Sequence, residues 1–563
     1  MIGRLDNWTS ALLDWGVSPL RQSLIVCLVA VLVLVPGLSS MPVTDRDEAR
    51  FAQASKQMIE TGDLIDIRFQ DQPRWKKPAG IYWLQAGSAS IFGGAEAPIW
   101  AYRLPSAFAA LLAALLTLWA ARPLVGARGA LIAGLMMTTT LLLVAEGHIA
   151  KTDAALAASA TAALGGLAHV FLGRGGWGAA AVFWFGIAAS ILLKGPIVPA
   201  IAGFALAGLW WHRETRSRFG NLHILPGLIA VVVLTAPWLI AIWQVSDGKF
   251  FAESLGKDMA AKMASGQEKH WGPPGLYLGL VWITFWPWAA LIPQAAGWAW
   301  RQRCLAWGLM VLAWIVPFWV VLEAIPTKLP HYVLPLYPAL AIAVAGYVVS
   351  GAAVPIWARR LGAGLIIVPG LIIALGVILL PVIPTLSGNA GPDVLPIEPA
   401  VFATVLAVFA AFAVLAAGMA AWRGQLAAQI GSSVMAALLL YPAILAHALP
   451  GARIGFPSTT LAAAIKQYRA CASGPAFSIG YHEPSLVFLT ETGLRNADPT
   501  GALKALDEDP GALVLIEDRW IDIVGPLPPH VVRRSIRYFN PNRGKMATAR
   551  LVTPDAPRWA DCS

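Results

Sequence analysis

Charged residues are scarce in this chain. Only 13% of its 563 residues are Asp, Glu, Lys or Arg, whereas soluble domains are about a quarter charged. Hydrophobic residues make up 57% of the chain, 25 residues are Trp, and the mean hydropathy is +0.64. This composition excludes an ordinary soluble domain and predicts a membrane protein with many spans.

Cysteine is also scarce, with four residues in the whole chain. Cys27 falls in the first apolar run and Cys304 beside a later one. Cys471 and Cys562 both fall in the more polar C-terminal part, and disulfides survive outside the cytoplasm. We predict that this last pair forms a disulfide; two free thiols are the alternative.

Common short motifs are missing. The chain has no GxGxxG, Walker A or HExxH pattern in a suitable context. The absence of a nucleotide-binding loop argues against ATP-driven transport and against a nucleotide-sugar donor. The formal charge of +10 does not indicate nucleic acid binding, because the basic residues lie in short loops between apolar runs, as membrane topology requires.

Apolar runs near the ~20 residues that cross a bilayer as a helix recur along the first 450 residues. They predict an α-helical polytopic membrane protein with about thirteen transmembrane helices. The runs cover residues 22–39, 99–121, 128–146, 154–172, 178–193, 195–211, 224–243, 274–297, 305–325, 332–350, 361–384, 399–421 and 429–449.

Arginine marks alternate loops between these runs. Such basic loops stay on the inner side of a membrane, so the N-terminus is expected inside and the C-terminal part outside. The arginines concerned are Arg4, Arg21, Arg122, Arg128, Arg174, Arg213, Arg216, Arg218, Arg301, Arg303, Arg359, Arg360 and Arg423.

Two domains follow from this pattern. Residues 1–450 form the membrane domain, in which 41–97 are the first outer loop with helices beside the membrane. Residues 451–563 form a small outer α/β domain, because 476–480 and 512–517 are typical of buried strands and 535–538 and 546–551 of a hairpin.

The first outer loop holds acids near its start and bases near its end. Asp47, Glu48 and Arg50 stand close together, and Lys76 and Lys77 follow later. The acids are also typical of a helix start, and the bases of a contact with anionic headgroups. Consecutive helical residues point ~100° apart, so Asp47 and Glu48 cannot face one site with equal ease.

Other polar residues reach the same membrane face from distant segments: Asp153, Lys194, His270 and Tyr332. Each has an ordinary explanation, as a snorkelling lysine, a loop histidine or an interface aromatic. Ionisable groups at span ends are costly unless they pair or line a cavity. Their convergence from five segments therefore predicts a functional site.

The order of the motifs resembles a known family. DEAR (47–50), RWKKPAGIYWL (74–84), WAYRLPSAFAALL (100–112), LLKGP (192–196), GQEKHWGPPGLYL (266–278) and TKLPHYVLPLYPALA (327–341) resemble the GT-C membrane glycosyltransferases. The similarity is to the bacterial branch around the aminoarabinose transferase of lipid A, with protein mannosyltransferases as distant kin.

The resemblance implies a polyprenyl-phosphate-linked sugar donor, such as an undecaprenyl-phosphate sugar. It also implies a lipid acceptor, such as lipid A, on the periplasmic face of the bacterial inner membrane. Asp47 falls on the essential carboxylate, with Glu48 as its neighbouring catalytic candidate. The substrate-binding positions that match are Arg50, Lys76, Lys77, Asp153, Lys194, His270 and Tyr332.

One position departs from the family. The family has Glu-Lys-Pro where this chain has Lys76-Lys77-Pro78, and that Glu belongs with a histidine like His270 to a metal site. A lysine opposes a cation, so a metal held by His270 with Asp47 is doubtful. We expect no required cofactor, and a monomer whose partners are its substrates and membrane lipids.

The mechanism that follows is an inverting glycosyl transfer. Lys77, Arg50 and Lys194 would hold the donor phosphate, and Asp47 would orient or deprotonate the acceptor. Rival functions are a flippase for lipid-linked sugars, and a transferase that acts on a protein or another glycolipid. Transporters hold ionisable groups near the midplane and often show internal repeats, neither of which is evident here.

Overall fold

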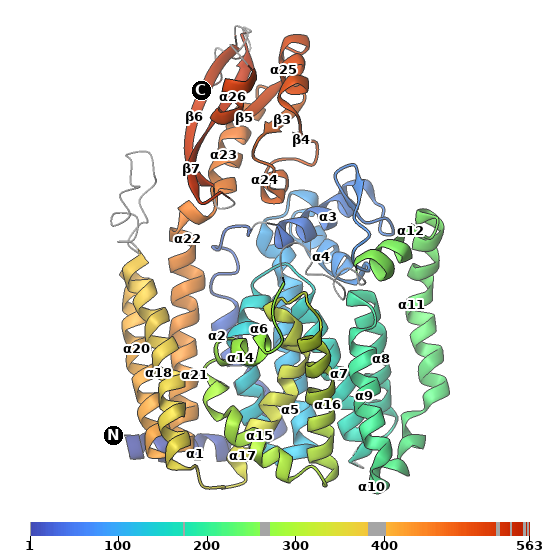
Figure 1. Ribbon diagram of the computed structural model, residues 1–563, viewed down its shortest axis with the longest axis vertical. Helices are drawn as coiled ribbons and strands as arrows, with labels where there is room; N and C mark the ends of the chain where they lie inside the picture. Colours follow the sequence, from blue (N-terminus) through green and yellow to red (C-terminus); the bar gives the residue numbers. More distant parts are fainter. Residues whose placement is uncertain are drawn as a thin grey trace.

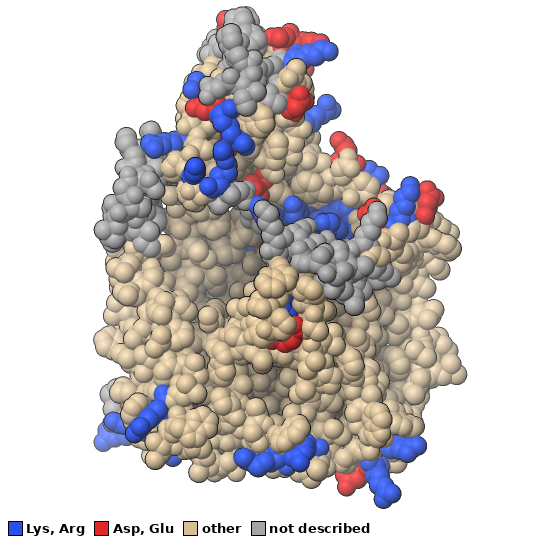
Figure 2. All heavy atoms as spheres, in the orientation of Figure 1, with Lys and Arg blue, Asp and Glu red and all other residues tan. Residues whose placement is uncertain are grey.

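A computed structural model of the chain shows a helical membrane body with a small α/β domain above it (Figure 1). The structure describes residues 2–562 except 45, 173–174, 259–270, 381–400, 525–529, 541–542, 556–558 and 560–561. The N-terminus lies at the lower end of the body and the C-terminus in the upper domain. Lys and Arg also gather along the lower end (Figure 2), which fits the predicted alternation of basic loops.

Nine helical segments within the described residues are long and apolar enough to span a membrane, or ten if one bent pair counts as a span. The main helices of the body are α1 (Ile2–Trp15), α2 (Pro19–Leu34), α5 (Ile99–Thr138), α6 (Leu141–Gly147), α7 (Asp153–Phe171), α8 (Trp177–Lys194), α9 (Ile197–Trp211), α11 (Ile224–Ser246), α14 (Leu276–Thr284), α15 (Ile292–Arg301), α16 (Ala306–Ala324), α17 (Tyr337–Val349), α18 (Ile356–Leu379), α20 (Val401–Arg423) and α21 (Leu426–Pro442).

Short helical turns connect or extend these helices. They are α10 (Arg213–Arg216), η2 (Phe219–Leu222), α12 (Lys249–Phe251), η3 (Ala252–Asp258), η5 (Trp288–Leu291), η6 (Pro330–Leu336), η8 (Ala443–Ala448), α22 (Leu449–Gly451) and η9 (Arg453–Gly455).

Within the described residues the predicted runs coincide with helices, and the parts 381–384 and 399–400 of two runs lie outside those residues. Three details differ from thirteen simple spans. Residues 99–138 form one element whose helical geometry breaks at Gly126, where φ is +73° and ψ 179°; glycine tolerates this backbone because it lacks a Cβ. The run 274–297 bends by 118° between α14 and the η5–α15 segment. Helices α2 and α9 are shorter than a full span.

The first outer loop folds against the top of the body. It contains α3 (Asp47–Thr61), strands β1 (Arg68–Phe69) and β2 (Gln72–Pro73), α4 (Gly80–Ile91) and η1 (Gly94–Glu96). Asp47 and Glu48 occupy the first turn of α3, where carboxylates are favoured by the helix dipole. Helix α3 ends at Gly62, which has a left-handed backbone.

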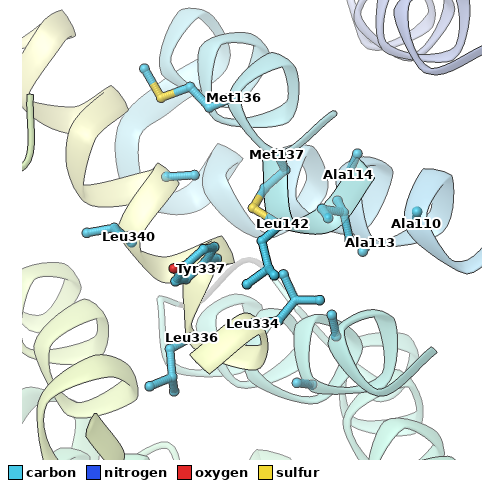
Figure 3. Packing of buried hydrophobic residues seen from close by; sticks show 14 of the residues in the cluster. Ala110, Ala113, Ala114, Met136, Met137, Leu142, Leu334, Leu336, Tyr337 and Leu340 are labelled. Atoms are coloured by element: carbon cyan, nitrogen blue, oxygen red, sulfur yellow. The ribbon is translucent and has the colours of Figure 1, made fainter. Parts of the chain in front are cut away.

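A dense apolar layer supports the ends of the helices that carry polar side chains. Figure 3 shows Leu142 of α6 beside Leu334 of η6, with Met137 of α5 nearby. All three are almost fully buried. This packing fixes the relative positions of α5, α6 and η6, and so of the charged residues at their ends.

The C-terminal domain contains a five-stranded sheet in the order β4-β3-β5-β7-β6. Strands β3 and β5 are parallel, and β7 is antiparallel to both β5 and β6. Its elements are α23 (Pro457–Arg469), β3 (Ala476–Ile479), α24 (Pro484–Leu489), β4 (Arg495–Asn496), α25 (Pro499–Glu508), β5 (Leu513–Glu517), α26 (Asp518–Val524), β6 (His530–Asn540) and β7 (Lys545–Pro554).

The predicted disulfide is confirmed. Cys471 and Cys562 are bonded with a Cα–Cα distance of 6.4 Å, whereas Cys27 and Cys304 are free. The bond ties the end of the chain to the residues that follow α23, so the domain is closed by a covalent link.

The C-terminal domain rests on the first outer loop. Gln53 of α3 donates to the Thr492 hydroxyl at 2.7 Å, and the Gln70 amide donates to the Thr492 carbonyl at 3.0 Å. Phe488 of α24 meets Tyr102 of α5 edge to face, with ring centroids 5.3 Å apart. The two domains therefore meet directly over the segment that begins with Asp47.

Candidate functional site

The start of α3 is anchored by a buried ion pair between Glu48 and Arg103 of α5. The Arg103 Nε donates to Glu48 Oε1 at 2.7 Å, and its Nη2 donates to Oε2 at 2.9 Å. Both side chains are fully buried. Bidentate geometry of this kind is strong and orientationally specific.

Backbone groups complete this anchor. Arg103 also donates to the carbonyls of Leu38 at 3.0 Å, Met41 at 2.6 Å and Pro42 at 2.8 Å. The segment between α2 and α3 therefore wraps around the Arg103 guanidinium group and is held by these bonds.

The Glu48 carboxylate also accepts several hydrogen bonds besides those from Arg103. Its oxygens accept from the backbone N–H groups of Thr44 at 2.8 Å and Ala150 at 3.0 Å, and from the Thr44 hydroxyl at 2.9 Å. Burial disfavours the ionised carboxylate, but Arg103 and these donors outweigh it and lower the pKa of Glu48. The predicted catalytic role does not fit this geometry, because Glu48 points away from open space and holds the loop.

Asp47 points to a different side of the helix and is exposed. Burial raises the pKa of Tyr82, and the Asp47 charge raises it further. The Asp47 charge also acts on Lys151. Asp47 therefore stands at an accessible surface, within electrostatic reach of a second group of charged residues.

That second group is buried and consists of Glu146, Lys151, Asp153, Lys194 and His331; we call it the charged cluster. Lys151 Nζ lies 3.1 Å from a Glu146 oxygen and 3.6 Å from an Asp153 oxygen. Lys194 donates to Asp153. The His331 ring nitrogens lie 3.7 Å from Glu146 and from Asp153.

The charged cluster draws on four separate elements. Glu146 ends α6, Asp153 starts α7, Lys194 ends α8 and His331 lies in η6. Asp153 benefits from the α7 dipole, and Lys194 from that of α8. The fold thus gathers two acids and two lysines at one end of the helices.

The acids around Lys151 keep its side chain charged despite its burial. Burial disfavours the charged form of Lys151, but Glu146, Asp153 and Asp47 outweigh it and raise the pKa of Lys151. Lys151 therefore keeps its positive charge beside the two carboxylates.

Tyr332 and Lys77 border the charged cluster. The Lys194 ammonium lies 5.1 Å from the centroid of the Tyr332 ring, a cation–π distance. Lys77 is half-buried and acts electrostatically on His331. The structure thus brings together the predicted residues Asp153, Lys194 and Tyr332, with Lys77 at their edge.

The other predicted residues lie around this core. Arg50 is half-buried one turn along α3 from Asp47, and Lys76 is exposed. His270 lies outside the described residues. Arg74, which was not assigned a role, lies over the Phe51 ring at 5.3 Å.

One peptide joins the anchor to the charged cluster. Ala150 N–H binds Glu48, and the next residue, Lys151, accepts from Ser106 of α5 through its carbonyl at 3.0 Å. Ser106 follows Arg103 by one helical turn. One face of α5 therefore positions both the Glu48 anchor and the segment that carries Lys151. Arg103 was missed at the sequence level, although an arginine inside an apolar run is itself a signal.

A divalent cation fits these residues poorly. Glu146, Asp153 and His331 offer ligand atoms within 4.8 Å of one another. However, the ammonium groups of Lys151 and Lys194 already bind the two carboxylates, and each would repel a metal ion. Lys76, at the position where the resemblance implies a carboxylate, is exposed and would also repel a metal ion.

Comparisons with known proteins find similar sequences. Residues 76–243 match the family model described as dolichyl-phosphate-mannose-protein mannosyltransferase. The undecaprenyl phosphate-α-4-amino-4-deoxy-L-arabinose arabinosyl transferase of Edwardsiella ictaluri is 29% identical over 329 residues, 56% of this chain and 58% of that protein. Its counterpart from Pectobacterium carotovorum is 28% identical over 381 residues, 65% of this chain and 66% of that protein.

The fold comparison extends over nearly the whole chain. The crystal structure of ArnT from Cupriavidus metallidurans bound to undecaprenyl phosphate superimposes with a TM-score of 0.74 at 21% identity, covering 96% of this chain and 98% of that one. The chain has the GT-C fold and is similar to the aminoarabinose transferases. The predicted resemblance to these transferases and the predicted fold class are confirmed.

Proposed function

We propose that this chain is a glycosyltransferase that moves a sugar from an undecaprenyl-phosphate carrier to a lipid acceptor such as lipid A. The observation that supports it most is the approach of Asp47 and Lys77, from the two ends of one loop, to a buried cluster with two lysines. The relatives' names supply the chemistry: an undecaprenyl phosphate-linked aminoarabinose.

In the proposed reaction the acceptor oxygen attacks the anomeric carbon of the sugar. The bond between that carbon and the phosphate oxygen breaks, and the phosphate leaves as an anion on its prenyl chain. Lys77, Arg50 and Lys194 stabilise the charge that grows on the leaving phosphate. Asp47 orients the acceptor and, where the acceptor is a hydroxyl, takes its proton.

We place the site and the C-terminal domain at the periplasmic face of a bacterial inner membrane. The basic loops gather at the opposite end of the body, as the positive-inside rule expects. The Cys471–Cys562 disulfide in the upper domain suits an oxidising compartment.

A protein acceptor is the second candidate. The family model that matches residues 76–243 is named for transfer of mannose to protein. Both candidate functions use a polyprenyl-phosphate donor. They differ in whether the acceptor positioned by Asp47 is a lipid or a protein.

Mass spectrometry of lipid A from cells with and without this chain tests the proposal. We expect a sugar adduct that depends on the chain, that Asp47→Asn abolishes, and that Asp71→Asn keeps. Asp71 is an exposed acid of the same loop, so it controls for charge. Normal transfer by the Asp47→Asn protein would refute the assignment of Asp47, and an unchanged lipid A would favour the protein acceptor.

A further inference from the structure

The β6–β7 hairpin of the C-terminal domain carries basic residues without acidic partners. Arg534, Arg537, Arg543 and Lys545 are all exposed; we call this set the basic hairpin. The Arg534 guanidinium donates to the neutral Gln467 side chain at 3.0 Å. None of the four forms an ion pair with a described acidic residue.

Four other basic residues of the same domain each form an ion pair with a described acidic residue, which neutralises their charge locally. The pairs are Arg469 with Glu491, Lys504 with Glu508, Arg519 with Glu517, and Arg550 with Asp518. The basic hairpin differs from them because it brings four such charges without a described acidic partner together.

Strand topology places the tip of the hairpin toward the membrane body. Strand β3 ends at Ile479, and the segment after it touches the first outer loop, with Glu483 3.9 Å from Arg46. Strand β5 is parallel to β3, so its last residue, Glu517, lies at the same end of the sheet.

The hairpin reaches beyond that end. Strand β7 is antiparallel to β5 and pairs Ala549 with Glu517. Lys545, the first residue of β7, lies four residues further toward the body, about 13 Å at the usual rise per strand residue. Strand β6 also contacts η9, the turn that leads from the last membrane helices into the domain.

The space-filling view agrees with this placement. Figure 2 shows blue side chains gathered on the lower part of the C-terminal domain, directly above the tan membrane body. Positive charge beside a bilayer surface attracts anionic lipids at roughly 1 kcal/mol per residue, which corresponds to about a fivefold change in affinity.

We propose that the basic hairpin binds the phosphate-bearing headgroups of anionic membrane lipids. It would hold the C-terminal domain against the bilayer surface beside the site. Arginine suits this role because its planar fork can bind two phosphate oxygens at once. The inference does not depend on the proposed glycosyl transfer.

Hydrogen exchange in nanodiscs tests the proposal on the full chain. Discs of phosphatidylcholine are compared with discs that also contain phosphatidylglycerol, and exchange is followed in peptides of β6 and β7. We expect slower exchange there with phosphatidylglycerol, reversed in 1 M salt, where the Debye length falls to about 3 Å. Equal exchange in both lipids would overturn the proposal.

A matched pair of variants separates the hairpin from net charge. Arg537→Gln with Lys545→Gln should abolish the lipid-dependent protection and weaken phosphatidylglycerol binding by about 25-fold, from two charges at about fivefold each. Arg495→Gln with Lys504→Gln removes two positive charges elsewhere in the domain. This variant should keep the lipid-dependent protection and the phosphatidylglycerol binding. Equal losses in the two double variants would show that overall charge, not the hairpin, attracts the lipid.

Discussion

Replacing Glu48 with Gln distinguishes a structural carboxylate from a catalytic one. The substitution keeps the shape of the side chain and removes its charge. It leaves the Arg103 guanidinium fully buried, with neutral oxygens as its only partners. We therefore expect the substitution to lower the free energy of unfolding, with any loss of transfer activity arising from that loss of stability.

The size of the loss follows from the burial. Removing one partner of a buried ion pair costs about 3–5 kcal/mol, because the remaining charge is left uncompensated. A typical domain is stable by only 5–15 kcal/mol, so the loss is a large share of the total. Glu48→Gln with Arg103→Gln removes both charges and should recover part of it, which a double-mutant cycle measures.

The assay is thermal unfolding of the detergent-solubilised protein, with transfer activity measured on the same samples. Asp47→Asn is the reference, because its exposed side chain should affect activity and leave unfolding unchanged. If Glu48→Gln unfolded like the wild type and lost all turnover, the anchor role would be wrong and Glu48 would be catalytic.

Acidity provides an independent check of the same pair. The pKa of Glu48 is lowered in the folded protein, so its contribution to stability is fully present above the ordinary glutamate pKa. That contribution falls away as the pH drops toward the folded value. The Glu48→Gln protein should lack this component of acid sensitivity.

Two further predictions concern the charged cluster and the disulfide. Lys194→Gln should weaken donor binding by about 10- to 100-fold, the value of a charge-assisted hydrogen bond, whereas Lys194→Arg should keep most of it; donor titration measures both. Replacing Cys471 and Cys562 with Ser opens a link across 91 residues and should destabilise the C-terminal domain by about 2–5 kcal/mol, measured by its thermal unfolding.

Much of the fold could be predicted because hydropathy alone identifies spans. The lengths of apolar runs located helices throughout the body, and Cys471 and Cys562 could be paired from their shared outer location. The break at Gly126 and the bend before α15 could not, because both depend on how neighbouring helices pack. The hydropathy of an apolar run does not show where the helix breaks or bends.

The site was predicted in part for the same kind of reason. Asp153, Lys194 and Tyr332 stood out as polar residues at the ends of apolar runs, and the structure joins them. His331 and Lys151 stood in the same segments but received no role, because sequence order does not show which groups meet. Their pairing with the acids depends on the end of α6, the start of α7, the end of α8 and η6 lying close together.

Helix geometry explains why Asp47 and Glu48, adjacent in sequence, play opposite parts. Glu48 is drawn inward by Arg103 and by the Ala150 N–H, which fixes the rotation of α3. Because neighbouring helical residues point ~100° apart, that rotation turns Asp47 outward, where its charge reaches Lys151. The Ala150 N–H belongs to the segment that also carries Lys151, so one short polypeptide sets both the anchor and the charged cluster. A change in the Glu48–Arg103 pair should therefore move Asp47 relative to the lysines and lower activity indirectly, through geometry.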